Sequence, residues 1–379
     1  MSTKRTRSRE GLGQRTRRTL SLAAIAAGLN VVLSYAVSLY TDQFRAGFEG
    51  GVQALFAQSW ETVPLSVLIA LACVVVFNKV LPRTHFRHKI LPAELPVKID
   101  AAVQRRVGRG DSVAGRQIRM LESEQGSDDL IVFLPGLGLD AEDFRTLMDL
   151  MPHVHCIAVT MYGFGTDEAD DPDYTPISLE THLHLLLELV LGRIRAKHPK
   201  KRLTVVGFSA GADYMLLVPE RETDRVQSLR IYHTVLLDPN VNNTTTVLSA
   251  RLGRMDPGRG PAHLNSLSDG AGDDDFQFLA TYVARICRKN LAHLTRHAAE
   301  VAAEWDTPNT ETFFKRLRLL ESSVGKVTCV FSNSYRHLCG ELAKGEAEAA
   351  PHFPSRGHFE LLSPEVLRPF IDPQHRHRD

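Results

Sequence analysis

A serine lies between two glycines in the segment GFSAG, which spans residues 207–211. An apolar, β-branched run precedes the segment and a helix-like stretch follows it, so the segment is expected to turn the chain from a strand into a helix. Glycine two residues before and two residues after Ser209 keeps such a turn free of side chains. The turn would expose the Ser209 hydroxyl at the head of the helix, where backbone N–H groups and the helix dipole favour an oxyanion. Ser209 is therefore the candidate nucleophile, with a purely structural turn as the alternative.

A serine hydroxyl is a poor nucleophile until a base accepts its proton. Among the 16 histidines of the chain, His358 is the candidate base, because a glycine precedes it and it follows the last expected strand. It lies in the segment RGHF at 356–359, before a helix expected over residues 364–370. Three other histidines are weaker candidates: His233, His337 and His352.

An acidic partner would hold the imidazole in the correct tautomer and stabilise its cation. Asp238 follows a strand expected over residues 232–237 and stands before Pro239. The alternative interpretation of Asp238 is a turn or helix-capping residue, a use that suits its residue type equally well. Glu341 and Asn333 follow the next expected strand and are the other candidates for the third position.

A glycine-rich turn follows the apolar run at 130–134, in the segment PGLGLD at 135–140. Gly136 and Gly138 allow the backbone to approach a bound carbonyl. The N–H groups of Leu137 and Ala210 are therefore the expected pair of oxyanion donors. A phosphate-binding loop is disfavoured here, because the segment lacks both the GxGxxG spacing and the lysine of a P-loop.

Short apolar runs alternate with helix-period stretches through most of the chain, which predicts βαβ units and a mostly parallel sheet of the α/β class. Uninterrupted apolar and β-branched content is typical of strands that are covered on both faces. The clearest strands are expected at 130–134, 155–160, 203–206, 232–237 and 327–331, and weaker ones at 96–103 and 117–121. Helices are expected at 179–196 and from residue 210 onward.

The stretch 241–324 interrupts this alternation with glycine- and aspartate-rich loops and with helical segments at 276–299 and 310–320. It is too long for an ordinary connection and is interpreted as an inserted helical cap over the sheet. An apolar group on its first helical segment packs either as the core of the cap or as a pocket for an acyl chain. The residues of this group are Phe276, Phe278, Leu279, Tyr282 and Val283.

Three motifs in this order, PGLG at 135–138, GFSAG at 207–211 and RGHF at 356–359, resemble the α/β-hydrolase superfamily. A looser fourth feature is YGFGT at 162–166, followed by an Asp-Tyr pair at 173–174. The resemblance spans about residues 91–370 and implies an α/β-hydrolase fold with a helical cap and a Ser–acid–His triad. The chain departs from the family pattern at the acid, because most members carry it after strand seven, where residues 331–337 contain no carboxylate.

The N-terminal part of the chain carries the signals of a membrane anchor. Seven basic residues lie between positions 4 and 18, and two uncharged runs follow at 20–40 and 63–78, the second extending to 81 if Lys79 snorkels. A bilayer core needs about 20 apolar helical residues, so both runs can span it. The connector at 41–62 contains one arginine, and the positive-inside rule then places both ends of a transmembrane helical hairpin in the cytoplasm. A cleaved signal peptide for the first run and a buried core helix for the second are the alternatives.

These signals predict four parts: a basic cytoplasmic tail (1–18), a two-helix multi-pass membrane anchor (19–82), a cytoplasmic hydrolase domain (91–370) and a polar tail (371–379).

The 45 basic and 44 acidic residues nearly balance, which disfavours a globally basic nucleic-acid binder. The five cysteines form no CxxC pair, so neither a zinc site nor a disulfide framework is indicated.

The expected activity is ester or thioester cleavage on a lipid or other hydrophobic acyl substrate, without a cofactor or a metal, because no cofactor motif accompanies the triad. A peptidase or acyltransferase would use the same residues, and a catalytically silent interaction module is the alternative outside enzymes. The oligomeric state is not predicted.

Overall fold

The computed structural model describes residues 90–96, 113, 116–166, 174–259, 267, 273–344 and 351–372. The chain divides into two compact units, Met1–Arg87 and His88–Asp379, and all described residues belong to the second. The expected membrane spans at 20–40 and 63–81 therefore lie outside the described residues. Within the described part of the chain, no helix combines the length and apolar character needed to cross a bilayer.

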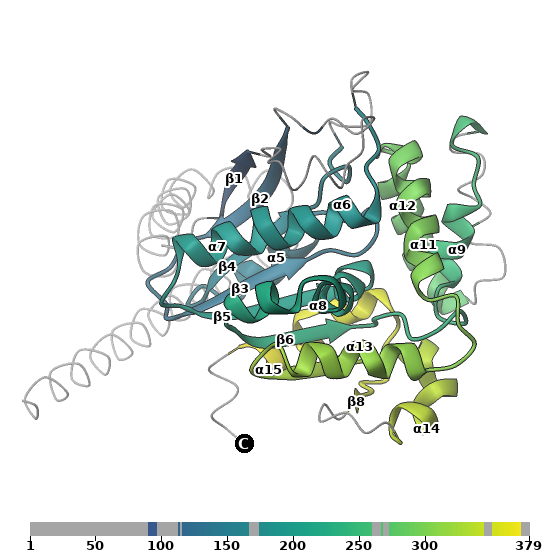
Figure 1. Cartoon of the computed structure of the whole chain (residues 1–379). Helices are drawn as coiled ribbons and strands as arrows, with labels where there is room; N and C mark the ends of the chain where they lie inside the picture. Colours follow the sequence, from purple (N-terminus) through teal and green to yellow (C-terminus); the bar gives the residue numbers. More distant parts are fainter. Residues whose placement is uncertain are drawn as a thin grey trace, which may run out of the picture. The chain divides into compact units, whose positions relative to one another are not determined.

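The strands of the described residues form one sheet in the order β1-β2-β4-β3-β5-β6-β7-β8 (Figure 1). β2 runs antiparallel to both of its neighbours, β1 and β4, and the other neighbouring pairs are parallel. The strands are β1 (Ile90–Pro96), β2 (Gln117–Ser123), β3 (Asp129–Leu134), β4 (His155–Thr160), β5 (Arg202–Phe208), β6 (Ile231–Leu237), β7 (Val327–Val330) and β8 (Pro351–His352). This is the mostly parallel α/β sheet that the sequence pattern predicts.

The five strands that were predicted most clearly all form, because layers of helices bury both of their faces. In β3, the four consecutive side chains from Ile131 to Leu134 are at most 1% exposed. The strand predicted at 96–103 meets β1 only at Pro96, and the remainder of that prediction lies outside the described residues. β8 was not predicted, since two residues are too few to show a periodic pattern.

Helices flank the sheet on both faces (Figure 1). α6 (Leu179–His184), a π-helical segment (Leu185–Leu191) and α7 (Gly192–Lys197) form one continuous stretch, which matches the helix predicted at 179–196. α8 (Ala210–Ser228) packs against β5 and β6, and α13 (Glu311–Glu321) packs against α8. The shorter helices are α5 (Arg145–Asp149), α14 (Cys339–Leu342) and α15 (Pro364–Ile371).

Between β6 and α13 the chain forms α9 (Val247–Gly253), α11 (Asp273–Ile286) and α12 (Leu291–Glu304), which gather at one end of the sheet (Figure 1). The segment predicted as one helix at 276–299 is two helices. The first ends at Ile286 and the second begins after Asn290, whose side chain caps it by accepting the His293 N–H at 3.0 Å. The predicted cap at 241–324 also includes α13, which instead packs against α8 in the helix layer of the sheet.

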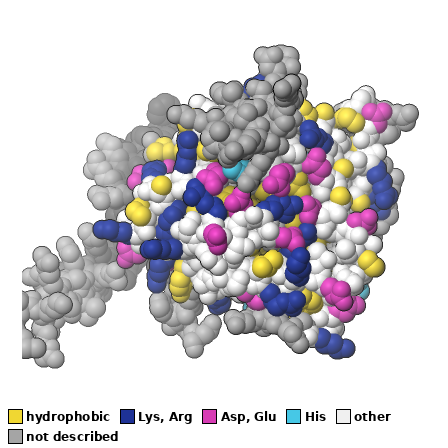
Figure 2. Space-filling view, in the orientation of Figure 1, with side chains coloured by type: hydrophobic (Ala, Val, Ile, Leu, Met, Phe, Trp, Pro, Cys, Tyr) yellow, Lys and Arg dark blue, Asp and Glu magenta, His cyan; other side chains and the backbone are white. Residues whose placement is uncertain are grey.

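Acidic and basic side chains are interspersed on the face shown in Figure 2, without a large field of one sign. Several acidic and basic side chains of the described residues pair between helices. Arg221 of α8 bonds Glu180 of α6 and Glu304 of α12, and Glu304 also accepts from Arg316 of α13 at 2.7 Å. These partly buried pairs connect the insertion to the helices that cover the sheet.

Candidate active site

Ser209 occupies the sharp turn between β5 and α8 that its sequence context predicts. Its φ of 51° lies in the left-handed region, which residues other than glycine rarely adopt. Its N–H donates to the Leu237 carbonyl at 2.8 Å, which ties the turn to the end of β6. A Cβ on Gly207 would overlap the backbone of Gly211, and a Cβ on Gly211 would overlap the backbone of Leu134. Both glycines of the GFSAG segment are therefore required by close backbone packing.

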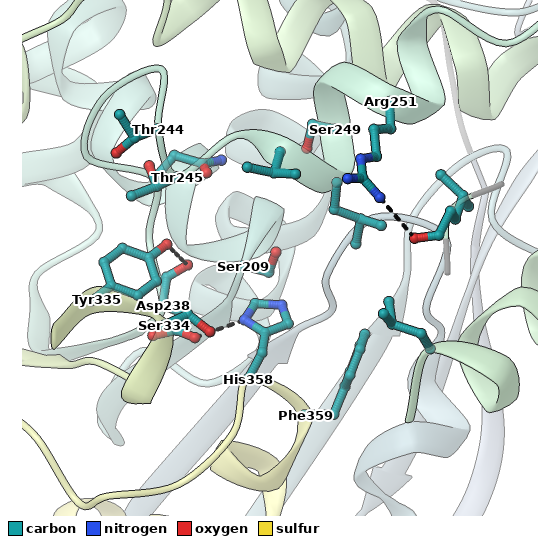
Figure 3. Close-up of a pocket in the computed structure, with 15 residues that line it drawn as sticks. Ser209, Asp238, Thr244, Thr245, Ser249, Arg251, Ser334, Tyr335, His358 and Phe359 are labelled. Carbon is teal, nitrogen blue, oxygen red and sulfur yellow. Dashed lines mark hydrogen bonds and ion pairs between the residues drawn. The ribbon is translucent and has the colours of Figure 1, made fainter. Parts of the chain in front are cut away.

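His358 and Asp238 form a direct pair beside this turn (Figure 3). The Nδ1 atom of His358 lies 2.7 Å from one carboxylate oxygen of Asp238, and the other oxygen accepts the Ser332 N–H at 2.6 Å. The Asp238 side chain is fully buried, whereas that of His358 is 25% exposed. With the Nδ1 proton donated to the carboxylate, the second ring nitrogen, Nε2, is left as an acceptor.

The backbone holds the Asp238 carboxylate in this direction. Asp238 has a φ of 47°, and its N–H donates to the Val330 carbonyl at 2.9 Å. The Tyr335 hydroxyl donates to the Pro239 carbonyl at 2.9 Å and lies 3.4 Å from that of Asp238. The strand end and the following turn are thus fixed from two sides.

The other candidates for the acid lie elsewhere. Glu341 is exposed on α14, and Asn333 is exposed with its N–H bonded to the Arg356 carbonyl at 2.7 Å. Neither lines the pocket that contains His358. Of the three candidates, Asp238 is the one that the structure brings to the imidazole.

Ser209, Asp238 and His358 line one pocket with a volume of about 380 Å³. In Figure 3 the imidazole lies between the Asp238 carboxylate and the Ser209 side chain. The apolar part of the wall comes from Val247, Leu248, Leu267, Leu279 and Phe359, and the polar part from Asn240, Thr244, Thr245, Ser249, Arg251, Ser334 and Tyr335. Most of this wall belongs to the insertion and to the segments after β6 and β7.

The side chains of the apolar group predicted on the first helical segment of the insertion lie in different environments. Leu279 lines the pocket, whereas Phe276 is 54% exposed. Tyr282 is buried, and its hydroxyl donates to the Leu137 carbonyl at 2.7 Å. Val283 packs partly buried against the core, and the side chain of Phe278 lies outside the described residues.

The turn after β3, which contains Leu137, packs against the turn at Ser209. A Cβ on Gly136 would lie 3.3 Å from the Ser209 Cβ and 3.0 Å from the Phe208 ring. Leu137 is buried, and Ala210 is the buried first residue of α8. The side chains of Leu137 and Ala210 contain no hydrogen-bond donor, so these residues could bind an oxyanion only through their backbone N–H groups.

The three weaker histidine candidates lie outside this pocket. His233 is buried in β6 with its Nε2 2.9 Å from the Thr328 hydroxyl. His337 is exposed, and its Nε2 lies 3.3 Å from the hydroxyl of Thr244. His352 belongs to β8 and packs against the Phe370 ring.

Sequence reasoning missed a buried pair behind the pocket wall. Asp213, one turn after Ser209 on α8, accepts the backbone N–H of Asn240 at 2.8 Å and its side-chain amide at 2.6 Å. Complete burial raises the pKa of the Asp213 carboxyl to about 7, against the lowering effect of these bonds and of Arg316. The pair fixes the segment two residues after Asp238. An aspartate inside a helix carries no sequence signal for this role.

Residues 131–369 match the model of the Alpha/beta hydrolase family, which covers well over half of the chain. The strand order, the turn at Ser209 and this match define an α/β-hydrolase-fold protein. The chain belongs to the alpha/beta hydrolase family.

Solved structures with the same fold are similar to this chain at low identity. A lipase candidate from Acinetobacter baumannii has 12% identity and a TM-score of 0.52, with 80% of this chain and 97% of that chain covered. An esterase from Thermogutta terrifontis has 13% identity and a TM-score of 0.49, with 76% and 98% covered. A 1H-3-hydroxy-4-oxoquinoline 2,4-dioxygenase has 19% identity and a TM-score of 0.48, with 66% and 93% covered. No curated protein matches the sequence. These similarities show the fold alone.

Proposed function

We propose that this protein is a membrane-anchored serine hydrolase that cleaves an ester or thioester of a lipid or other hydrophobic acyl substrate. The observation that carries the proposal is the 2.7 Å bond between His358 and Asp238 in the pocket that Ser209 also lines. A serine in a strained turn, an imidazole and a buried carboxylate in one pocket have the composition of a nucleophile, a base and an orienting acid.

In the proposed reaction, the Ser209 hydroxyl attacks the carbonyl carbon of the substrate while Nε2 of His358 accepts its proton. The buried Asp238 carboxylate stabilises the imidazolium that forms. The imidazolium then protonates the leaving alcohol or thiol, and an acyl-enzyme remains on Ser209. Water, deprotonated by the same nitrogen, attacks the acyl-enzyme and releases the acid.

The oxyanion of each tetrahedral intermediate would accept hydrogen bonds from the N–H groups of Leu137 and Ala210. The close packing of Gly136 against Ser209 supports this assignment, because it brings the two backbone segments together. The bond from Tyr282 to the Leu137 carbonyl gives the first segment a fixed orientation. A prearranged donor of this kind contributes about 10²–10³ to kcat.

The substrate class rests on the pocket and on the N-terminal sequence. Five apolar side chains line the pocket, Leu279 and Phe359 among them, and these suit the hydrocarbon part of an acyl group. The uncharged runs at 20–40 and 63–78, the second extending to 81 if Lys79 snorkels, would hold the domain at a bilayer, where acyl lipids are concentrated.

Hydrolysis rates on acyl esters and thioesters of graded chain length, compared with aminoacyl amides, test this function. The expected result is turnover of the acyl substrates that rises with chain length and disappears in Ser209→Ala. Ser228→Ala, at the exposed end of the same helix, is the matched control and should retain the wild-type rate. Faster cleavage of the amides would instead support a peptidase, and no turnover of any substrate by folded protein would support a silent binding module.

A further inference from the structure

Three histidine side chains outside the pocket converge where the insertion packs on the sheet domain. His182 lies on α6, and His293 and His297 lie four residues apart on α12, a spacing that puts both rings on one face of the helix. The Nε2 atoms of His182 and His293 are 3.1 Å apart, and the ring centroids of His182 and His297 are 4.3 Å apart. One nitrogen of each ring lies within 4.8 Å of the others.

The surroundings of this histidine cluster (His182, His293 and His297) keep the three rings uncharged. All three are at most 1% exposed, and the rings of Tyr162 and Phe164 pack against them. Burial lowers the pKa of His182 to about 3 and those of His293 and His297 well below the usual value. Neutral imidazoles are the form that binds metal ions.

Two nitrogens of the cluster have no hydrogen-bond partner among the described residues, namely Nδ1 of His182 and Nδ1 of His297. The Nε2 atom of His297 lies 2.6 Å from the Tyr214 hydroxyl. Buried polar atoms in native proteins are almost always paired, so the unpaired Nδ1 of His297, whose other nitrogen already faces Tyr214, indicates a missing ligand on that ring.

The backbone beside the cluster leaves room where a side chain would normally stand. Gly163 has a φ of 84°, and a Cβ at this position would overlap both the Tyr174 hydroxyl and Nε2 of His293. Gly163 belongs to the YGFGT segment, which the proposed hydrolase chemistry does not use. Only glycine allows the rings to approach this close to the chain.

A second group of potential metal ligands consists of Glu122, His155 and His198. Unlike the histidine cluster, this group lies beside two lysines. Lys197 lies 3.0 Å from Glu122, and the ammonium group of Lys201 lies 2.8 Å from Nδ1 of His155. Both lysines repel a metal cation, and Lys197 already pairs with the carboxylate. This group is an ion-pair network and serves as the control for the histidine cluster.

We infer that His182, His293 and His297 bind a divalent transition-metal ion, of which Zn²⁺ fits the donor set best. Imidazole nitrogens are common ligands of Zn²⁺, and at a Zn–N distance of about 2.0–2.1 Å the edge of a tetrahedron is about 3.3 Å. The 3.1 Å separation of the two Nε2 atoms is close to this edge. Binding through Nε2 of His293 would protonate its Nδ1 and break the long 3.4 Å contact from the Ile177 N–H.

The ion would link α12 of the insertion to α6 beside the sheet. None of its three ligands lines the pocket of Ser209, so the site is structural and separate from the proposed acyl transfer. A water molecule or hydroxide could fill the fourth position, and the Tyr174 hydroxyl borders the same space as Nε2 of His293.

The test uses the full-length protein, stripped with a chelator and titrated with Zn²⁺ and separately with Co²⁺, whose visible absorption reports tetrahedral coordination. We expect about one ion per chain and, since even outer-shell changes cost 10–100-fold in affinity, at least about a tenfold loss in His182→Gln and in His293→Gln. His198→Gln, in the control group, should bind as the wild type does. Hydrogen exchange in α12 should slow when the ion is added.

Wild-type protein that takes up neither ion would overturn the inference, whatever the variants do. Equal losses in His198→Gln and His182→Gln would also overturn it, because the ion would then bind elsewhere or non-specifically. If the ligand variants fail to fold, the absorption of the wild-type Co²⁺ form decides the matter by its presence or absence.

Discussion

Two groups of histidines among the described residues have contrasting environments. His358 is partly exposed at a pocket, with one ring nitrogen bonded to a buried carboxylate. His182, His293 and His297 are buried among aromatic rings, and none of them has a hydrogen bond to a carboxylate among the described residues. The first environment leaves one ring nitrogen free to accept a hydrogen bond, whereas burial in the second lowers the pKa of all three rings. The difference teaches that the neighbouring groups, not the residue type, decide which role suits an imidazole: the proposed proton transfer in the pocket or the proposed metal binding in the cluster.

The two regions also differ in how the backbone forms them. In the pocket, Ser209 and Asp238 themselves adopt left-handed φ values, so the strain lies on the residues proposed to react. At the histidine cluster the left-handed position is Gly163, and the histidines lie on regular helices. The strained backbone in the pocket sets the direction of the Ser209 and Asp238 side chains, whereas Gly163 leaves space for the rings of the histidine cluster.

The largest expected effect is a loss of kcat from a substitution in the pocket. Asp238→Asn removes the charge that stabilises the imidazolium and allows the wrong tautomer, so kcat should fall by about 10⁴. Steady-state rates on the preferred acyl substrate measure this loss. Glu341→Gln is the control and should remain within about twofold of the wild type, because surface positions seldom affect chemistry. A large loss in the control and a small one in Asp238→Asn would move the acid to Glu341.

The next effect concerns the cluster. Gly163→Ala forces a left-handed non-glycine residue and a Cβ into the space of Tyr174 and His293. We expect a loss of about 2–5 kcal/mol in the free energy of unfolding, from backbone strain and overpacking together. Chemical denaturation measures it, and Gly126→Ala, which would meet no atom within 4 Å, is the control. Equal stability of the two variants would show that the cluster is loosely packed.

A smaller expected effect is the dependence of the free energy of unfolding on pH. The folded pKa of Asp213, about 7, lies above its ordinary value of 3.8, so the folded protein binds this proton more tightly than the unfolded chain. Its stabilising contribution is therefore complete below pH 3.8 and is lost as the pH rises through 7. Relative to Asp213→Asn, the wild type should lose about 1.4 kcal/mol per pH unit within this window.

Unfolding free energies of both proteins at several pH values measure this difference. The other groups that act on Asp213 are Asn240, Arg316 and Glu304, and they are the same in the two proteins. Parallel pH profiles for wild type and variant would contradict the raised pKa.

Much of the fold could be predicted from the sequence, because continuous β-branched runs such as residues 130–134 have few alternatives to a buried strand. Local sequence signals did not predict the elements whose position depends on tertiary contacts. The start of α12 after Asn290 depends on a cap that any of several polar residues could form, and β8 exists only through its pairing with β7.

Part of the candidate site could likewise be predicted from the sequence. The turn around Ser209 has a glycine pattern that close packing demands, and the place of His358 in the chain made it the candidate base. The Asp238 carboxylate could not be distinguished from a turn residue, since its direction depends on a φ of 47° that the sequence does not show. The histidine cluster was missed because His182 and His293 are 111 positions apart and no motif joins them.

The central claim is that Ser209 is a nucleophile activated by His358. Reaction of the full-length protein with a fluorophosphonate, followed by peptide mass spectrometry, tests it most directly. The account predicts a single adduct on Ser209 that does not form in Ser209→Ala and forms far more slowly in His358→Ala. Folded protein without an adduct, or with one on another residue, would contradict it.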